Sequence, residues 1–93
     1  VRYVSNSFKW ELKNVSKEEL KEKNIDQGAK IIYTADTRYR DSLVNYIITK
    51  VNDQKVNNAE NAVKLLEKAA KGGYSIVIEV INVSGEKETL RFR

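Results

Sequence analysis

Residues 46–92 read YIITKVNDQKVNNAENAVKLLEKAAKGGYSIVIEVINVSGEKETLRF and hold the pattern that decides the fold. The opening YIITKVN is rich in β-branched residues, which favour a strand over Tyr46–Asn52 with Ile47 and Val51 on one face. The DQKV segment that follows predicts a tight turn into a very short strand. We therefore expect a strand, a turn and a short strand ahead of a helix.

That helix is expected over Ala59–Lys71 and is the clearest single element. Apolar residues recur at spacings of three and four, which gives the helix one apolar stripe. The stripe comprises Ala62, Val63, Leu66, Ala69 and Ala70. The opposite face, expected to be solvated, carries Lys64, Glu67, Lys68 and Lys71. The pattern indicates an amphipathic helix that covers a sheet.

Both ends of the helix carry capping signals. Asn57 or Asn58 is the expected N-cap, and Glu60 is placed to complete a capping box with Asn57. Gly72 and Gly73 predict the end of the helix, because glycine readily adopts the left-handed conformation that terminates many helices.

The chain closes with a predicted hairpin. Ile76, Ile78 and Val80 alternate with other residues inside Tyr74–Asn82, as in a strand with one buried face. A VSGE turn then leads into a last strand over Thr89–Arg93. The two strands are expected to pair with each other.

The N-terminal part of the chain predicts two further strands and a short helix. A strand is expected over Phe8–Lys13, and the next over Ala29–Thr34. Between them a helix is expected over Lys17–Lys23, where Ser16 and Glu19 have the spacing of a capping box. Its apolar content is small, so local capping should hold it.

The order of these elements predicts an α+β domain with a largely antiparallel sheet or partly open barrel of five to six strands, one long helix and one short helix. Residues 35–45 carry no sustained period and predict a loop. Residues 1–7 are expected to be either flexible or an edge strand. A length of 93 residues suits one domain over residues 1–93.

Composition excludes several classes of chemistry. The chain has no cysteine, histidine, methionine or proline, so disulfides, thiolate catalysis and imidazole metal sites are absent from it. Neither a Gly-x-Ser-x-Gly turn nor another nucleophile context is present, and Glu18, Glu19 and Glu22 on one short helix would repel each other rather than share a proton. We therefore expect no catalytic residues, no metal and no cofactor.

The charges are interspersed rather than grouped. Lys and Arg number 17 against 13 Asp and Glu, a net charge of +4, which suits solubility. The single Arg38-Tyr39-Arg40 triplet is a weak signal for nucleic acid, so we expect no nucleic-acid partner. No apolar run approaches the roughly 20 residues that a membrane-spanning helix needs, and no membrane insertion is expected.

The order and strings of residues 46–92 resemble PDZ domains, especially those of bacterial HtrA/Deg-type serine proteases. The Ile-rich strand, the Val-Asn turn, the asparagine cap, the AVKLL helix segment and the closing hairpin carry the resemblance. A weaker match covers WELKNVSKEELKEKNIDQGAKII at residues 10–32. Lys9 stands where the family usually has the glycine of its carboxylate-binding loop, and the family's Gly-Leu-x-x-Gly-Asp stretch appears at residues 41–46 without either glycine.

The resemblance implies a PDZ-like fold and a non-catalytic, peptide-binding function. A peptide would add as a strand between the Phe8–Leu12 edge and the long helix. The implied partners are the C-termini of peptides or unfolded proteins, with the protease domain or other subunits of a serine protease parent as the alternative. An extracytoplasmic, periplasmic location is implied by the family alone. The implied peptide-binding residues are Phe8, Lys9, Trp10, Glu11, Leu12, Ala59, Ala62, Val63 and Leu66.

Several alternatives stay open at this point. Val63 and Leu66 have the same pattern if they are simply core residues, and Phe8 and Trp10 are equally consistent with packing under the N-terminal residues. Lys9 either pairs with a terminal carboxylate or is a solvated surface charge. The second function we consider is a structural or assembly module whose groove packs against a neighbouring domain or subunit. The missing glycine at Lys9 favours this second function.

Overall fold

The structure is a computed structural model of the 93-residue chain, and it describes residues 3–35, 43–73 and 75–92. Within these ranges, seven strands and two helices follow one another. In order they are β1 (Tyr3–Ser5), β2 (Trp10–Asn14), α1 (Lys17–Glu22), β3 (Ala29–Thr34), β4 (Ile47–Val51), β5 (Gln54–Lys55), α2 (Ala59–Lys71), β6 (Ile76–Ile81) and β7 (Lys87–Phe92). The predicted order of elements is confirmed, and residues 3–5 form the edge strand that was one of the two states expected for residues 1–7.

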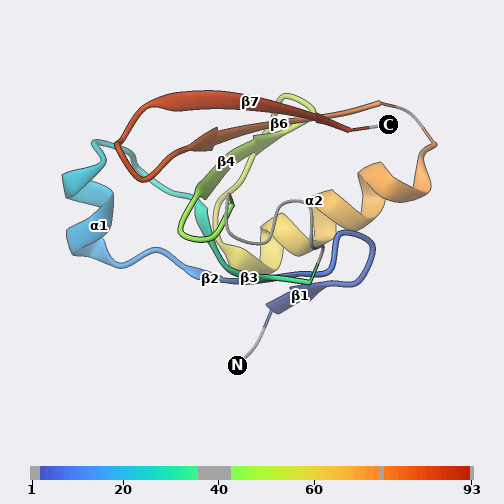
Figure 1. The fold of residues 1–93 in the computed structure, drawn as a ribbon, viewed down its shortest axis with the longest axis horizontal. Coiled ribbons are helices and arrows are strands. Elements are labelled where there is room, and N and C mark those ends of the chain that lie inside the picture. The colour runs from blue at the N-terminus through green and yellow to red at the C-terminus, as the bar shows by residue number, and fades with distance from the viewer. Residues whose placement is uncertain (1–2, 36–42, 74, 93) are drawn as a thin grey trace.

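The sheet is antiparallel throughout and runs in the order β1-β2-β3-β4-β6-β7, with β5 paired to β4. The α+β class is confirmed. The expected count of five to six strands is wrong, because residues 3–5 form a strand of their own at the edge. Figure 1 shows β6 and β7 along one side of the molecule, β1, β2 and β3 along the opposite side, and α2 between the two sides.

The core fills the space between these sides. It includes Trp10 and Leu12 of β2, Ile31 of β3, and Ile78 and Val80 of β6, each no more than 2% exposed. Three aromatic rings join the two ends of the sheet. The Phe8 and Trp10 ring centroids are 4.9 Å apart, and the Phe92 ring of β7 meets Phe8 edge-on at 5.6 Å and Trp10 at 5.9 Å. These contacts bring β7 next to the start of β2, although the two strands are far apart in the sheet order.

A bulge in β4 changes which of its residues share a face. The pairing of β4 with β6 shifts register between Ile48 and Lys50, so that Ile48 and Val51 both point into the core. Ile47 lies opposite Ile81 on the other face of the sheet. The prediction that Ile47 and Val51 share one face is wrong, because it assumed an unbroken alternation.

The helix ends follow local rules, with one change of partner. The Ser16 side chain accepts the Glu19 N–H at 3.2 Å and caps α1, as predicted. In α2 the N-cap is Asn58, whose side chain accepts the Asn61 N–H at 2.8 Å, while the Asn61 side chain accepts the Asn57 N–H at 2.9 Å. The predicted capping box between Asn57 and Glu60 is therefore wrong, because the side chain of Asn61, one position later, accepts the Asn57 N–H. At the other end Gly73 has a φ of 70°, the predicted left-handed position.

Gly28 lies where no side chain fits. A Cβ on this residue would stand 2.8 Å from Cγ2 of Ile47 and 3.1 Å from the carbonyl oxygen of Ile48. The residue therefore permits β3 to start close against β4. The predicted loop over residues 35–45 lies largely outside the described residues, and within them Leu43 is buried.

Candidate functional site

The β2 edge that the sequence predicted to be open is filled by β1. The two strands pair antiparallel, with Tyr3 opposite Leu12, Val4 opposite Glu11 and Ser5 opposite Trp10. β1 also lies against α2. The expectation of a free edge at Phe8–Leu12 is therefore wrong for this state of the chain, because its own N-terminal residues occupy the place of an added strand. We call the position between β2 and α2 the strand site.

β1 alternates its side chains between the interior and solvent. Ser5 is completely buried, and Tyr3 is half-buried and packs against the core. Val4 between them is 41% exposed. The strand site thus has two inward positions, filled by the first and third residues of an extended segment.

Glu67 of α2 holds β1 and the turn that follows it. The Ser5 hydroxyl donates to Oε2 at 3.2 Å, and the Asn6 N–H donates to Oε1 at 3.1 Å. The Ser7 N–H reaches both carboxylate oxygens at 3.3 Å. The prediction that Glu67 is merely solvated is wrong. Its partners lie about 60 positions earlier in the chain, so helical spacing alone gave no signal for this role.

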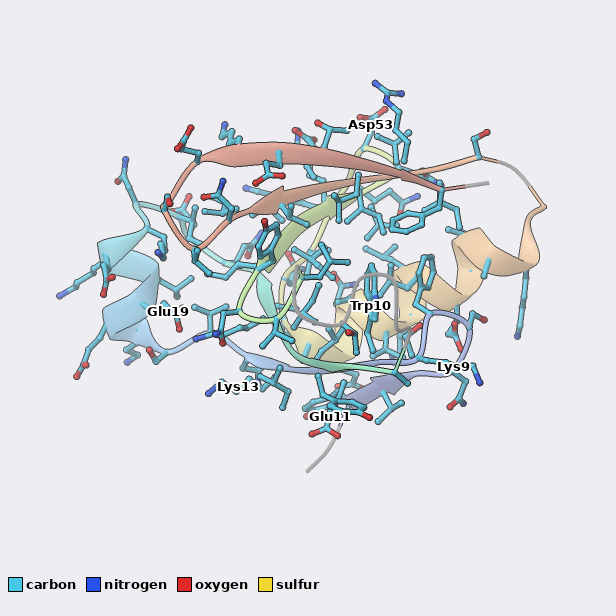
Figure 2. The ribbon with its side chains drawn as sticks, viewed as in Figure 1. Lys9, Trp10, Glu11, Lys13, Glu19 and Asp53 are labelled. Carbon is cyan, nitrogen blue, oxygen red and sulfur yellow. The ribbon has the colours of Figure 1, made fainter. Side chains whose placement is uncertain are left out.

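The turn between β1 and β2 shapes the end of the site. Lys9 has a φ of 59°, an uncommon conformation for a residue with a side chain, and β2 begins only at Trp10. The Lys9 N–H donates to the Ser5 carbonyl at 2.7 Å, and the Lys9 carbonyl accepts the Ala35 N–H at 2.9 Å. The predicted strand start at Phe8 is wrong, because this left-handed residue interrupts extended backbone. Figure 2 shows the Lys9 side chain pointing outward from the turn.

Most of the predicted binding residues belong to the core in this state. Five are buried to 2% exposure or less, namely Trp10, Leu12, Ala59, Ala62 and Leu66. Val63 and Phe8 are half-buried and pack against them. Figure 2 shows Trp10 directed into the interior, whereas Glu11 of the same strand points away from it. The structure thus brings β2 and α2 together as predicted, with their apolar side chains serving the core beneath the strand site.

A second contact fixes the far end of the strand site. The Asn14 side chain, at the end of β2, accepts the N–H of Ala59, the first residue of α2, at 2.8 Å. Together with the Glu67 contacts, this bond ties α2 to the β1–β2 hairpin at both ends of the site. The separation of β2 and α2 is therefore set by hydrogen bonds as well as by packing.

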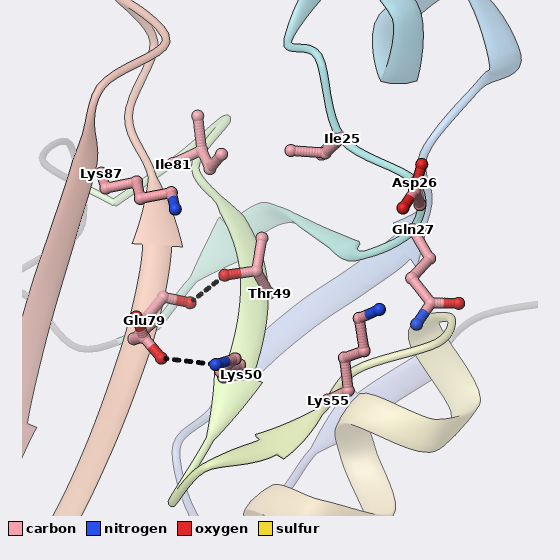
Figure 3. Close-up of a pocket in the computed structure, with 9 residues that line it drawn as sticks. All are labelled: Ile25, Asp26, Gln27, Thr49, Lys50, Lys55, Glu79, Ile81 and Lys87. Carbon is pink, nitrogen blue, oxygen red and sulfur yellow. Dashed lines mark hydrogen bonds and ion pairs between the residues drawn. The ribbon is translucent and has the colours of Figure 1, made fainter.

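Away from the strand site, a hollow of about 230 Å³ lies beside β4 and β5 (Figure 3). Lys50, Lys55 and Lys87 contribute to its wall, with Ile25 and Ile81 as apolar neighbours. Lys50 is 3.7 Å from the Glu79 carboxylate, and both side chains are more than a third exposed. An exposed ion pair of this kind is screened by water and by salt. The hollow is therefore a weaker candidate for a binding site than the strand site.

The pKa of Tyr46, at the far end of the sheet from β1, is perturbed. Desolvation raises the pKa of Tyr46 above its ordinary value of 10.0, and the neighbouring Glu88 carboxylate raises it further. The Tyr46 hydroxyl donates to Oε2 of Glu88 at 3.4 Å. The same Glu88 oxygen accepts the Asn82 side-chain N–H at 2.7 Å. Tyr46 is therefore neutral at physiological pH, and the contact ties β7 to the residue before β4.

Over residues 3–35, 43–73 and 75–92 no group of three or more acidic side chains is gathered in a way that would hold a metal ion. Nor does a helix in those ranges combine the length and the apolar character required to cross a bilayer. Comparison with known proteins gives no match: no family model, no curated protein and no solved structure matches this chain. Any functional interpretation must therefore stand on the geometry of the strand site.

Proposed function

We propose that this chain is a non-catalytic interaction module, PDZ-like in architecture, that receives an extended peptide segment between β2 and α2. The observation that carries the proposal is the antiparallel pairing of β1 with β2 beside α2. A segment of the chain itself makes the contacts that a peptide strand would make there. Strand addition of this type draws affinity from main-chain hydrogen bonds and specificity from alternate side chains.

The surrounding architecture supports the proposal. α2 packs against β1, β2, β3 and β4, and the sheet is antiparallel and open at both ends. A sheet edge flanked by an amphipathic helix is the arrangement that strand addition requires. The resemblance of residues 46–92 to PDZ domains points the same way.

Peptide binding at this site requires β1 to leave it. β1 pairs over only three residues, and Val4 at its centre is exposed. A tethered strand competes at an effective concentration of roughly millimolar. The apparent affinity for a peptide is therefore reduced by the fraction of molecules in which β1 is docked. β1 acts in this proposal as a resident competitor.

The test is an NMR titration of the chain carrying Ser5→Asp, which places a second carboxylate beside Glu67, and we expect the repulsion between the two to displace β1. Peptides with free and with amidated C-termini are added to the ¹⁵N-labelled protein. Shifts gathered in Glu11–Asn14 and in Ala59–Glu67 are expected. A folded variant that responds to no peptide would refute the proposal.

A second function, a structural or assembly module, is favoured by the occupied state itself. Such a module predicts a site that is closed in the isolated domain, and β1 closes it. In this case β1 stays docked and the surrounding surface contacts a neighbouring domain or subunit. Sedimentation of the unaltered chain together with its parent protein's other domains distinguishes the two functions, because assembly proceeds there without release of β1.

The role within a larger protein follows from the resemblance and is part of the proposal. The module would recruit substrates to, or regulate, a serine protease parent in an extracytoplasmic compartment. Fusing the module to a reporter peptide and following its degradation by the intact parent protein tests this role. Degradation that is unaffected by substitutions in the strand site would argue against it.

A further inference from the structure

We infer that the strand site selects an internal segment of the form aromatic-x-Ser, and that Glu67 rejects a chain that ends there in a free carboxylate. This inference rests on the proposed function and specifies its ligand. It differs from the sequence-based expectation, in which C-termini are the partners and Lys9 receives their carboxylate.

The third position of the site is a small, closed space with one acceptor. Ser5 is completely buried there, and its hydroxyl donates to Glu67 Oε2 at 3.2 Å while accepting the Phe8 N–H at 3.4 Å. A hydroxyl group satisfies both a carboxylate and an amide, which a methyl group cannot do. Because Ser5 has no exposed surface, a larger side chain at this position would have to displace its neighbours. The site therefore favours serine at this position.

The first position takes an aromatic side chain. Tyr3 is half-buried and packs against the core, two residues before Ser5 on the same face of the strand. Val4 between them points outward and is 41% exposed, so the middle position places little demand on the ligand.

The end of the site favours a chain that continues. The Ser5 carbonyl accepts the Lys9 N–H at 2.7 Å, and the next atom along the chain, the Asn6 nitrogen, lies 3.1 Å from Glu67 Oε1. In a peptide ending at serine, the second oxygen of the terminal carboxylate would take the place of that nitrogen. It would then face the Glu67 carboxylate at hydrogen-bonding distance without a proton between them, and like charges so placed repel.

The Lys9 side chain does not offset this repulsion in the structure. It points outward from the turn and is exposed. The groups that meet the end of β1 are instead the Glu67 carboxylate and the backbone amides of the turn. An internal segment supplies two N–H donors to Glu67, whereas a C-terminus supplies none and adds a negative charge.

The experiment measures binding of three fluorescent peptides to the full chain carrying Ser5→Asp, at pH 7 and low salt. The first peptide is RYVSNS with both ends capped, which copies residues 2–7. The second is RYVS with an amidated end, and the third is RYVS with a free carboxylate. The last two differ only in the terminal group: the amide supplies an N–H donor to Glu67, whereas the carboxylate supplies none and adds a negative charge.

The capped RYVSNS peptide is expected to bind most tightly, and the free carboxylate of RYVS to weaken binding by tenfold or more relative to its amide. Replacing the serine by alanine in RYVSNS should weaken binding several-fold. Adding Glu67→Gln should remove the penalty of the free carboxylate, because a glutamine donates an N–H to it. Glu60→Gln, on the exposed face of the same helix, is the matched control and should leave the penalty unchanged.

The outcomes separate the inference from the proposed function. Equal binding of the free and amidated RYVS peptides would overturn the inference and leave peptide binding intact. Absence of binding by all three peptides would overturn both. If Ser5→Asp does not fold, amide exchange in the chain that keeps Ser5 decides: relative to that chain, Glu67→Ala should speed exchange at Asn6 and Ser7 at least tenfold, and unchanged exchange would overturn the role of Glu67.

Discussion

The two ends of the sheet are built differently. At one end β1 pairs with β2 over three residues and is held to α2 through one carboxylate. At the other end β7 pairs with β6 over six residues in continuous register. The short end has a buried polar anchor, whereas the long end is secured by the hairpin and by apolar packing of Leu90 and Phe92. In the proposed function, the β1 end is the replaceable part of the sheet.

The largest expected effect comes from the side chain that both ends share. Trp10 is 2% exposed and touches the rings of Phe8 and Phe92. Trp10→Ala should lower the free energy of unfolding by about 3–5 kcal/mol, because it leaves a large cavity at the meeting point of β2 and β7. Urea denaturation followed by circular dichroism measures this. A loss below about 1 kcal/mol would show that the aromatic contact does not join the ends.

The next effect lies at the connection between the two ends. Gly28→Ala should lower the free energy of unfolding by about 1–3 kcal/mol, because its Cβ would stand 2.8 Å from Ile47 Cγ2 and 3.1 Å from a backbone oxygen. The same denaturation measurement applies. Gly85→Ala is a useful contrast, because its Cβ meets nothing within 4 Å and any cost arises from its φ of 87° alone.

A smaller effect should be confined to the β1 end. Glu67→Ala removes the acceptor of the Ser5 hydroxyl and of the Asn6 and Ser7 amides, and should weaken the docking of β1, rather than the fold as a whole, by about 1–2 kcal/mol. Hydrogen exchange should accelerate in β1 and remain unchanged in β6 and β7. Glu60→Ala serves as the control on the same helix, and equal acceleration in both halves of the sheet would contradict the comparison.

The smallest effect concerns the β7 end and alkaline pH. Burial and Glu88 raise the pKa of Tyr46 in the folded chain above 10.0. A raised pKa means that the neutral form is favoured by folding, so this contribution is complete below pH 10 and is lost as the pH rises through the folded-state pKa. Tyr46→Phe should therefore lose less stability than the unaltered chain between pH 9 and pH 11. If both proteins lost the same stability between pH 9 and pH 11, Tyr46 would not be the group whose ionisation causes the loss.

The elements that the sequence predicted well depend on local interactions. Ser16 caps α1 through a residue three positions later, and the stripe of α2 follows from helical spacing. Both can be derived from neighbours in the chain. The same holds for the hairpin of β6 and β7, whose turn and alternation lie within one short stretch.

The features that were missed depend on distant partners. β1 is only three residues long, too short to show a period, and it is extended because β2 and α2 flank it. Glu67 acts on residues some 60 positions away, and the bulge between Ile48 and Lys50 is visible only against β6. The resemblance therefore implied β2 and α2 as the two walls of the site, and residues 1–7 were expected to be flexible or an edge strand, but nothing predicted that this strand fills the site.

Native-state hydrogen exchange of the unaltered chain tests most directly whether β1 is a replaceable occupant. If β1 leaves the strand site without unfolding the sheet, as proposed, we expect its amides to exchange by local opening at least a hundredfold faster than the paired amides of β6. Equal protection in β1 and β6 would contradict the account, because it would mean that β1 opens only when the whole domain unfolds and that the strand site is never available to a peptide.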